Sequence, residues 1–184
     1  MSYTLPTALE VGGRLYGIDT DYRAALDAIE AMNDPDLSDG EKAMVALYML
    51  YDDPEAASGA GLTEALERCV WYLNGGEEGE GRKGPRLMDW QQDFGLIAAP
   101  VSRVLGRDIR QPEPLHWWTF LSAYQEIGDC LFAQVVAIRD KLARGKKLDR
   151  SEREWYNRNR RLVTLRQRFS QRDNDVLSVW TGGK

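Results

Sequence analysis

The chain has a single histidine, His116, within the stretch PEPLHWWTFLSAY between Pro112 and Tyr124. Two of the six tryptophans and two prolines accompany it in seven residues. A histidine can act as a general acid or base, but that role needs a partner that orients the ring or a nucleophile beside it. Asp108 and Glu113 lie on the preceding connection, and no serine or cysteine is spaced for a triad. Three interpretations follow: a catalytic site, a binding surface, or the start of a buried helix.

The residues around His116 favour the third interpretation. Glu113 and Pro114 suit the first turn of a helix, because proline there gives up no hydrogen bond. Helical spacing then predicts a core-facing stripe of three apolar residues: Leu115, Trp118 and Leu121. Trp117 and Tyr124 lie beside this stripe, and Trp117 is expected to be partly exposed. Both are candidate partner-binding residues, since exposed aromatic side chains often anchor interfaces.

Other motifs match ligand sites only in part. Residues 34–45 begin like a calcium loop, but the glycine comes one place late and Val45 stands where a glutamate should bind. Residues 79–84 (GEGRKG) have the glycines of a dinucleotide fingerprint without the flanking strand and helix. Cys69 and Cys130 are isolated and are expected to be reduced core residues. The sequence therefore predicts no cofactor, no metal and no catalytic residues; an enzyme with an unrecognised carboxylate site is the weakest alternative.

A basic stretch extends from Arg139 to Arg172, with 13 Lys/Arg against 4 Asp/Glu. Clustered cations can neutralise nucleic-acid phosphates, so a nucleic-acid face is one hypothesis. No helix-turn-helix, zinc or RNA-recognition pattern accompanies the stretch, and the whole chain is acidic. A solvated helix face or a surface for an acidic protein partner is favoured. Arg158 and Arg161 are the candidate partner-binding residues of this stretch.

Charge divides the chain into two halves. Residues 1–80 carry 17 Asp/Glu and 4 Lys/Arg, a net of −13, whereas residues 81–184 carry 12 and 20, a net of +8. The expected organisation is a hairpin plus acidic helices over 1–74, a Gly-rich linker over 75–86 and a basic helical bundle over 87–184, together forming one compact unit. Opposite charges in the two halves also favour head-to-tail self-association.

Composition indicates a globular protein of the cytoplasm. The chain is 43% hydrophobic and 10% aromatic, and no apolar run approaches the roughly 18 residues that a membrane span needs. The N-terminus MSYTLPTALEVGG lacks the layout of a signal peptide. We therefore expect a cytoplasmic protein without membrane contact.

Local patterns predict a mainly α-helical fold with a short N-terminal β-hairpin. ALEV and RLYGI flank Gly12-Gly13, a pair suited to a two-residue turn. Capping residues and apolar spacing then predict the helices. In the first half they run from Asp19 or Thr20 to Met32, from the Ser38/Glu41 capping box to Tyr51, and from Thr63 to Leu73. In the second half they run from Met88 to Leu105 with a kink or break at Pro100, from Glu113 to Ile127, from Asp129 to Ala143, and from the Ser151/Glu154 capping box to Ser170. The helices from Met88 onward are expected to form the main bundle, anchored by the stripe that contains Trp118.

Four segments give the chain a family resemblance, up to about Leu165. They are IDTDYR after the hairpin, the SDGEK helix start, MDWQQDFGLIAAPV, and LHWWTFLSAYQEIGD followed by VVAIRDKL. In these segments the sequence resembles the siphophage and prophage family known as bacteriophage gene-product-fifteen protein. The histidine–tryptophan–tryptophan block with the preceding DWQQDF segment is the most specific part, and residues 75–84 match most loosely.

The resemblance implies a role in phage assembly. Family members are encoded near the tape-measure gene, in the region of the tail-assembly chaperones. A non-enzymatic assembly factor that binds the tape-measure protein or tail-tube subunits is therefore the leading hypothesis. A nucleic-acid-associated phage protein that uses residues 139–172 is the alternative. No catalytic residues are carried over from the family.

Overall fold

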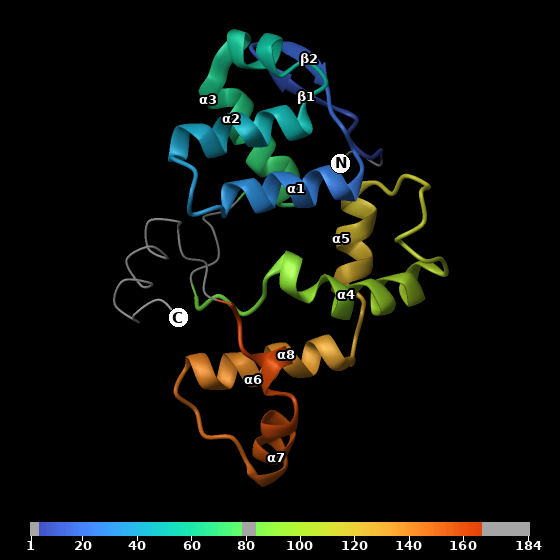
Figure 1. Cartoon of the computed structure of the whole chain (residues 1–184). Coiled ribbons are helices and arrows are strands. Elements are labelled where there is room, and N and C mark those ends of the chain that lie inside the picture. Colours follow the sequence, from blue (N-terminus) through green and yellow to red (C-terminus); the bar gives the residue numbers. More distant parts are fainter. Residues whose placement is uncertain (1–3, 79–83, 167–184) are drawn as a thin grey trace, which may run out of the picture. The chain divides into compact units, whose positions relative to one another are not determined.

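The computed structural model describes residues 4–78 and 84–166 (Figure 1). Within these ranges the chain forms a two-stranded antiparallel hairpin and eight helices. Their bounds are β1 Ala8–Val11, β2 Arg14–Gly17, α1 Tyr22–Met32, α2 Asp39–Leu50, α3 Pro54–Leu73, α4 Trp90–Leu105, α5 Trp117–Gln125, α6 Leu131–Ala143, α7 Arg150–Arg158 and α8 Arg160–Val163. The prediction of a mainly helical fold with an N-terminal hairpin is confirmed.

The chain divides into two compact units. Among the described residues, the first unit consists of 4–78 and 114–118, and the second of 84–113 and 119–166. Residues 114–118 thus join the hairpin and α1–α3, whereas the sequence predicted that they anchor the second-half bundle. The physical reason is a pair of main-chain hydrogen bonds, from Tyr22 N to Leu115 O and from Trp117 N to Thr20 O, each 2.8 Å long.

The hairpin of the first unit is the local structure that its glycines predict. Gly12 and Gly13 both have positive φ angles, 56° and 75°, as a two-residue hairpin turn requires. The strands pair in register from Ala8 opposite Gly17 to Val11 opposite Arg14. Leu9 and Val11 are buried, and β1 packs on α3. The hairpin therefore contributes one apolar face to the core of the first unit.

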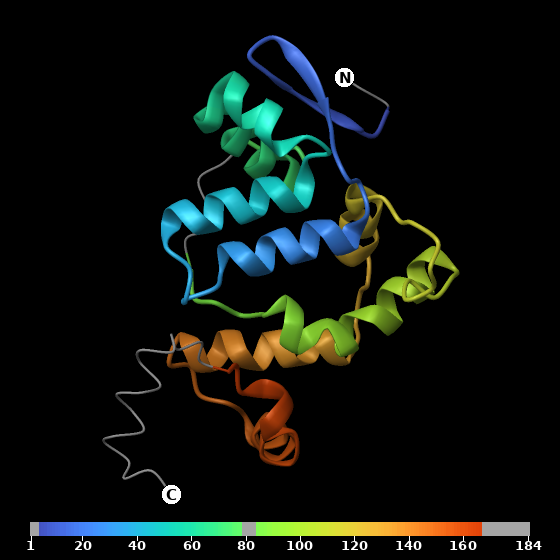
Figure 2. The same cartoon turned by 45° about the horizontal axis from the view of Figure 1, so that its top comes forward.

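Helices α1 and α2 lie side by side in the first unit (Figure 2). Asp21 caps α1 by accepting a hydrogen bond from Arg23 N, so the cap lies one or two residues after the predicted positions. Ser38 and Glu41 form the predicted capping box of α2. The two helices bury a shared set of apolar residues: Tyr22, Ala25, Ala28, Ala46, Leu47 and Leu50.

Helix α3 begins at Pro54, and the prediction of a start at Thr63 is wrong. Asp53 accepts a hydrogen bond from Ala56 N and Pro54 occupies the first turn. Gly61 departs from helical geometry (φ 169°, ψ 97°), so the element is two helical segments joined at this residue. The second segment is the one predicted. The first was missed because its glycines and its small apolar side chains give little helical periodicity.

The first residues of the predicted linker over 75–86 belong to the C-terminal end of α3. Gly75 N and Gly76 N donate to Tyr72 O and Trp71 O, which closes the last turn of α3. Residues 79–83, which contain most of the GEGRKG motif, lie outside the described residues. Further along, Arg86 forms an ion pair with Asp89, the cap of α4.

In the second unit, α4 runs from its Asp89 cap to Leu105 without a break at Pro100. Helix α6 begins two residues after its predicted start and ends at the predicted residue. The predicted long helix over 151–170 is wrong, because α7 ends at Arg158 and α8 ends at Val163. The capping box of α7 is Asp149 with Glu152, two residues before the predicted Ser151/Glu154 pair. Residues beyond 166 lie outside the described part of the chain.

Candidate functional site

His116 contacts the main chain through both ring nitrogens. Its Nδ1 accepts a hydrogen bond from Trp118 N at 3.0 Å, and its Nε2 lies 2.9 Å from Pro6 O. These contacts fit the neutral tautomer with its proton on Nε2, which then donates to Pro6 O. The ring therefore caps the first turn of α5 and fastens the N-terminal segment, so acid–base chemistry at His116 would require breaking a structural contact.

The order of burial of the two tryptophans after His116 is the reverse of that predicted. Trp117 is 1% exposed and its Nε1 donates to Leu73 O at 3.0 Å. Trp118 is half-buried; its Nε1 donates to Tyr72 O at 2.9 Å and its ring stacks on Tyr72 with centroids 6.0 Å apart. Trp117 therefore cannot be an exposed anchor, and that prediction is wrong.

The error comes from the start of the helix. Helix α5 begins at Trp117 rather than at Glu113, and the residues before it are extended. Along α5 and the turn after it, the buried positions are Trp117, Phe120, Ala123 and Ile127. The predicted stripe of Leu115, Trp118 and Leu121 is displaced from this face: Leu115 is buried in the extended segment, whereas the other two are half-buried.

Asp21 joins two segments that are distant in the sequence. One of its carboxylate oxygens accepts from Arg23 N at 2.9 Å, and the other accepts from Leu115 N at 3.1 Å, across 94 positions. Asp21 and His116 also form an antiparallel bridge. The IDTDYR and LHWW motifs therefore meet in the first unit. The sequence showed each motif separately but gave no signal that they pair.

Trp118 also explains a glycine at the end of α3. A Cβ atom on Gly76 would lie 2.7 Å from Cη2 of Trp118, and the φ of Gly76 is +84°. Both features exclude a side chain at this position. Trp71 lies edge-on to Trp118 with centroids 5.3 Å apart, so the end of α3 packs closely around the half-buried ring.

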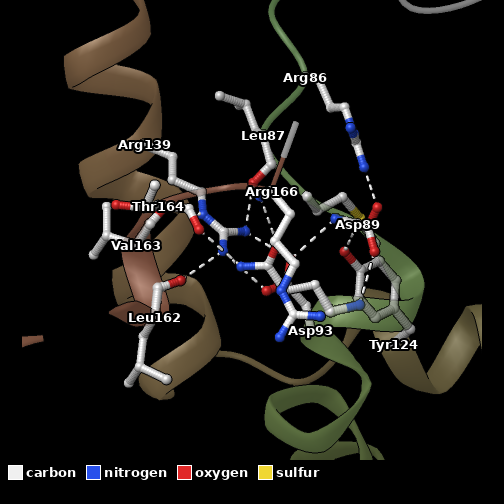
Figure 3. A network of polar contacts seen from close by, with 12 residues as sticks. Arg86, Leu87, Asp89, Asp93, Tyr124, Arg139, Leu162, Val163, Thr164 and Arg166 are labelled. Carbon is white, nitrogen blue, oxygen red and sulfur yellow. Dashed lines mark hydrogen bonds and ion pairs between the residues drawn. The ribbon is translucent and has the colours of Figure 1, made fainter. Parts of the chain in front are cut away.

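The second unit has a buried ion pair at its centre (Figure 3). Asp93 is 1% exposed and Arg139 is 4% exposed. Arg139 Nη1 donates to Asp93 Oδ2 at 2.6 Å and Nη2 donates to Oδ1 at 2.9 Å. The pair is bidentate, the strongest geometry for arginine and carboxylate. The sequence placed Arg139 in an exposed basic stretch, and this part of the prediction is wrong.

Arg139 uses its remaining donors on main-chain carbonyls. Nε donates to Val163 O at 2.7 Å, Nη1 to Leu87 O at 3.0 Å and Nη2 to Leu162 O at 2.6 Å (Figure 3). All five guanidinium N–H groups are thus engaged. Two of these acceptors, Leu162 O and Val163 O, are carbonyls of the last turn of α8, so Arg139 caps the C-terminal end of this helix.

The DWQQDF motif supplies the other side of this network. Asp89 caps α4, and its N–H donates to Asp93 Oδ2 at 3.0 Å. Gln92 holds the extended segment after α8: its Nε2 donates to Thr164 O and its Oε1 accepts from Arg166 N, both at 2.9 Å. Structural contacts therefore account for three of the polar side chains of this motif, those of Asp89, Gln92 and Asp93. A buried, fully bonded carboxylate such as Asp93 is poorly suited to bind a substrate.

The other three predicted partner-binding residues lie in the second unit. Tyr124 is half-buried, with its hydroxyl 3.2 Å from Met88 Sδ and its ring 5.0 Å from that of Trp90. Arg158 and Arg161 are exposed on either side of Asn159, the residue between α7 and α8. Both arginines therefore lie near the junction of α7 and α8.

In the first unit an open hollow of about 570 Å³ is lined by Thr63, Glu64, Glu67, Arg68, Trp71 and Glu78. Glu64 in this hollow already accepts a hydrogen bond from Gly12 N at 2.9 Å. Over residues 4–78 and 84–166, no group of three or more His, Cys, Asp or Glu residues is placed to hold a metal ion. No helix in the same ranges is long and apolar enough to cross a membrane.

Comparison with known proteins gives the class of the chain. Residues 1–165 match the family described as Bacteriophage Gp15 protein. The chain belongs to this bacteriophage protein family, as the resemblance of its four segments implied. Neither the curated proteins nor the solved structures contain a significant match.

Proposed function

We propose that this protein is a non-enzymatic assembly factor of a siphophage tail that binds the tape-measure protein or tail-tube subunits. The observation that carries the proposal is the family match over residues 1–165. The family resemblance associates such chains with the genes for the tape-measure protein and the tail-assembly chaperones. A binding partner encoded nearby and present during assembly in the host cytoplasm is the natural candidate.

The contacts of the motif residues support a binding role over a catalytic one. His116, Asp93 and Arg139 are residue types that an enzyme could use in catalysis. Both ring nitrogens of His116 contact main-chain atoms. Asp93 and Arg139 are hydrogen-bonded to each other. These contacts position helices. The exposed helix surfaces are then the candidates for binding a partner, because proteins recognise helical partners through such surfaces.

The alternative, nucleic-acid binding, rests on the exposed cations around α7. Lys146, Lys147 and Arg153 are exposed there, in addition to Arg158 and Arg161. However, carboxylates are interspersed on the same surface and pair with cations, as in Arg144–Asp140, Lys141–Glu152 and Arg150–Glu154. A mixed surface of this kind suits a protein partner better than a phosphate backbone.

Co-expression with the cognate tape-measure protein tests the proposal. We expect the tape-measure protein to be retained on the tagged chain and to be more soluble in its presence. The Arg158→Ser/Arg161→Ser variant should retain less of it than the matched Lys146→Ser/Lys147→Ser variant, which makes the same charge change in the preceding loop. Recovery of neither the tape-measure protein nor the tail-tube protein would refute the proposal. Retention of duplex DNA that is lost steeply with salt would favour the alternative.

A further inference from the structure

Helix α2 presents apolar side chains to solvent. Its buried face consists of Ala46, Leu47 and Leu50, whereas Met44, Tyr48 and Met49 are 38%, 53% and 43% exposed. Surface helices usually place polar residues on their outer face. Single exposed apolar residues are common, but here Met44 and Tyr48 lie one turn apart and form a strip on the outer face of the helix, with Met49 next to Tyr48 in the sequence.

Carboxylates border this strip. Glu41 lies one turn before Met44 on the same face, and Tyr48 donates its hydroxyl hydrogen bond to Glu55 Oε1 at 3.1 Å. We call Glu41, Met44, Tyr48, Met49 and Glu55 the α2 ridge. It lies in a strongly acidic region, since residues 1–78 carry 16 Asp/Glu against 4 Lys/Arg, a net of −12.

An arginine-rich surface is the chemical complement of the α2 ridge. The three methylene groups of an arginine can cover methionine side chains while its charged end stays outside. The guanidinium can stack on a tyrosine ring and can donate two hydrogen bonds to a carboxylate. Lysine lacks both the planar stacking surface and the paired donors, so it fits the ridge less well.

The chain itself carries such a surface. Arg150, Arg153, Arg158, Arg160 and Arg161 are exposed on α7 and α8, and we call them the arginine face. Within residues 139–166 there are 11 Lys/Arg against 4 Asp/Glu, a net of +7. Arg153 and Arg158 contact the carbonyls of Leu148 and Glu154 at 3.4 and 3.3 Å, so each guanidinium retains donors for a partner.

We propose that the α2 ridge of one copy binds the arginine face of a second copy. The two surfaces differ, so the contact is heterologous and joins copies head to tail, as a closed ring or as an open chain. Because much of the attraction is between exposed charges, the contact weakens as salt shortens the Debye length, which is about 8 Å at physiological ionic strength. The arginine face includes Arg158 and Arg161, the candidate residues for binding a tail component, whereas the α2 ridge has no part in the proposed binding of that component.

Charge reversal with mixing tests the proposal on the full chain. A ridge-reversed variant carries Tyr48→Lys and Glu55→Lys, and a face-reversed variant carries Arg158→Glu and Arg161→Glu. In sedimentation velocity at low salt, the wild-type protein should associate as its concentration rises. Each variant alone should associate at least tenfold more weakly. An equal mixture of the two should associate again, because the intact acidic ridge of one variant meets the intact arginine face of the other.

The four substituted residues are all exposed, so both variants are expected to fold, and unchanged circular dichroism melts would show it. A mixture that stays as monomeric as its components would overturn the proposal, as would a wild-type protein that stays monomeric at every concentration. Charge reversals that shift the melt without any dependence on concentration would also overturn it, because they would place the contact within one chain. A tape-measure pull-down that survives in the ridge-reversed variant, which keeps Arg158 and Arg161, would leave the proposed function intact while this interface fails.

Discussion

The two units fasten distant parts of the chain by different physical means. In the first unit, Trp117 and Trp118 bury aromatic area and donate their indole N–H groups to the last carbonyls of α3. In the second unit, one buried arginine binds one buried carboxylate and three carbonyls. The contacts of the two tryptophans are between neutral groups, whereas the second unit has a charge pair in the corresponding role.

This difference determines how each unit should fail. Removing an indole leaves a cavity and an unpaired carbonyl, and the cost depends on how far the surroundings can collapse. Removing the arginine leaves a carboxylate in a site without solvent, which is costly whatever the packing. Loss of the buried charge partner is therefore expected to cost at least as much as loss of the buried indole, and hydrogen exchange can report on the two units separately.

The largest effect is expected for Arg139→Met. This substitution preserves much of the side-chain volume but leaves Asp93 without its partner and frees the carbonyls of Leu87, Leu162 and Val163. We expect a loss of about 3–5 kcal/mol in the free energy of unfolding of the second unit. Urea denaturation with hydrogen exchange on α4 and α6 measures it.

Two further variants make this first prediction specific. Arg144→Met removes an exposed ion pair with Asp140 and should cost less than about 1 kcal/mol. The double variant Asp93→Leu/Arg139→Met should be more stable than Arg139→Met alone, because no buried charge remains. A double variant at least as unstable as Arg139→Met would mean that the carbonyl contacts, rather than the ion pair, hold the second unit together.

The next largest effect is expected for Trp117→Ala in the first unit. Because Trp117 is fully buried, its truncation should cost about 3–5 kcal/mol, as large aromatic core deletions do. Trp118→Ala should cost about 1–3 kcal/mol, since this ring is half-buried. Thermal melts of the two variants compare them directly. Equal costs, or a greater cost for Trp118→Ala, would contradict the assignment of Trp117 as the core residue.

A moderate loss of stability is expected for the first unit in alkali. Burial raises the pKa of the Cys69 thiol to about 12, and burial also raises the pKa values of Tyr51 and Tyr72 above their ordinary range. The unfolded chain releases these protons at lower pH than the folded chain, so their stabilisation is present below about pH 9 and is lost as pH rises towards 12. Hydrogen exchange from pH 8 to about 10.5 should show weakening of α3, and Cys69→Ala should make the pH dependence shallower. An unchanged slope in that variant would exclude Cys69 as a contributor.

The smallest effect is expected at His116. His116→Ala removes the acceptor for Trp118 N and the contact with Pro6 O, and should cost about 1 kcal/mol, as loss of a helix cap does. His116→Asn keeps a capping group and should recover part of this loss. Urea denaturation compares the three proteins. A variant with unchanged stability but no binding to the tape-measure protein would instead identify His116 as a functional residue.

Local chemistry was enough to predict several elements of the fold. Gly12-Gly13 sets the hairpin turn, because two consecutive residues adopt positive φ angles without steric strain only when they lack a side chain. Ser38 and Glu41 set the start of α2, because the capping box needs only atoms three residues apart. The apolar spacing of the second segment of α3 and of α6 indicated those helices for the same local reason.

The tertiary structure alone decided which distant groups meet. Many carboxylates could pair with Arg139, and only packing selects Asp93, 46 residues away. Similarly, Asp21 accepts a hydrogen bond from Leu115 N across 94 positions. Helix α5 begins two residues later, at Trp117, and the expected order of burial of the two tryptophans is reversed. Side-chain type and spacing determine what a residue can bond to, but the partner is selected by the burial of whole surfaces, which depends on every element at once.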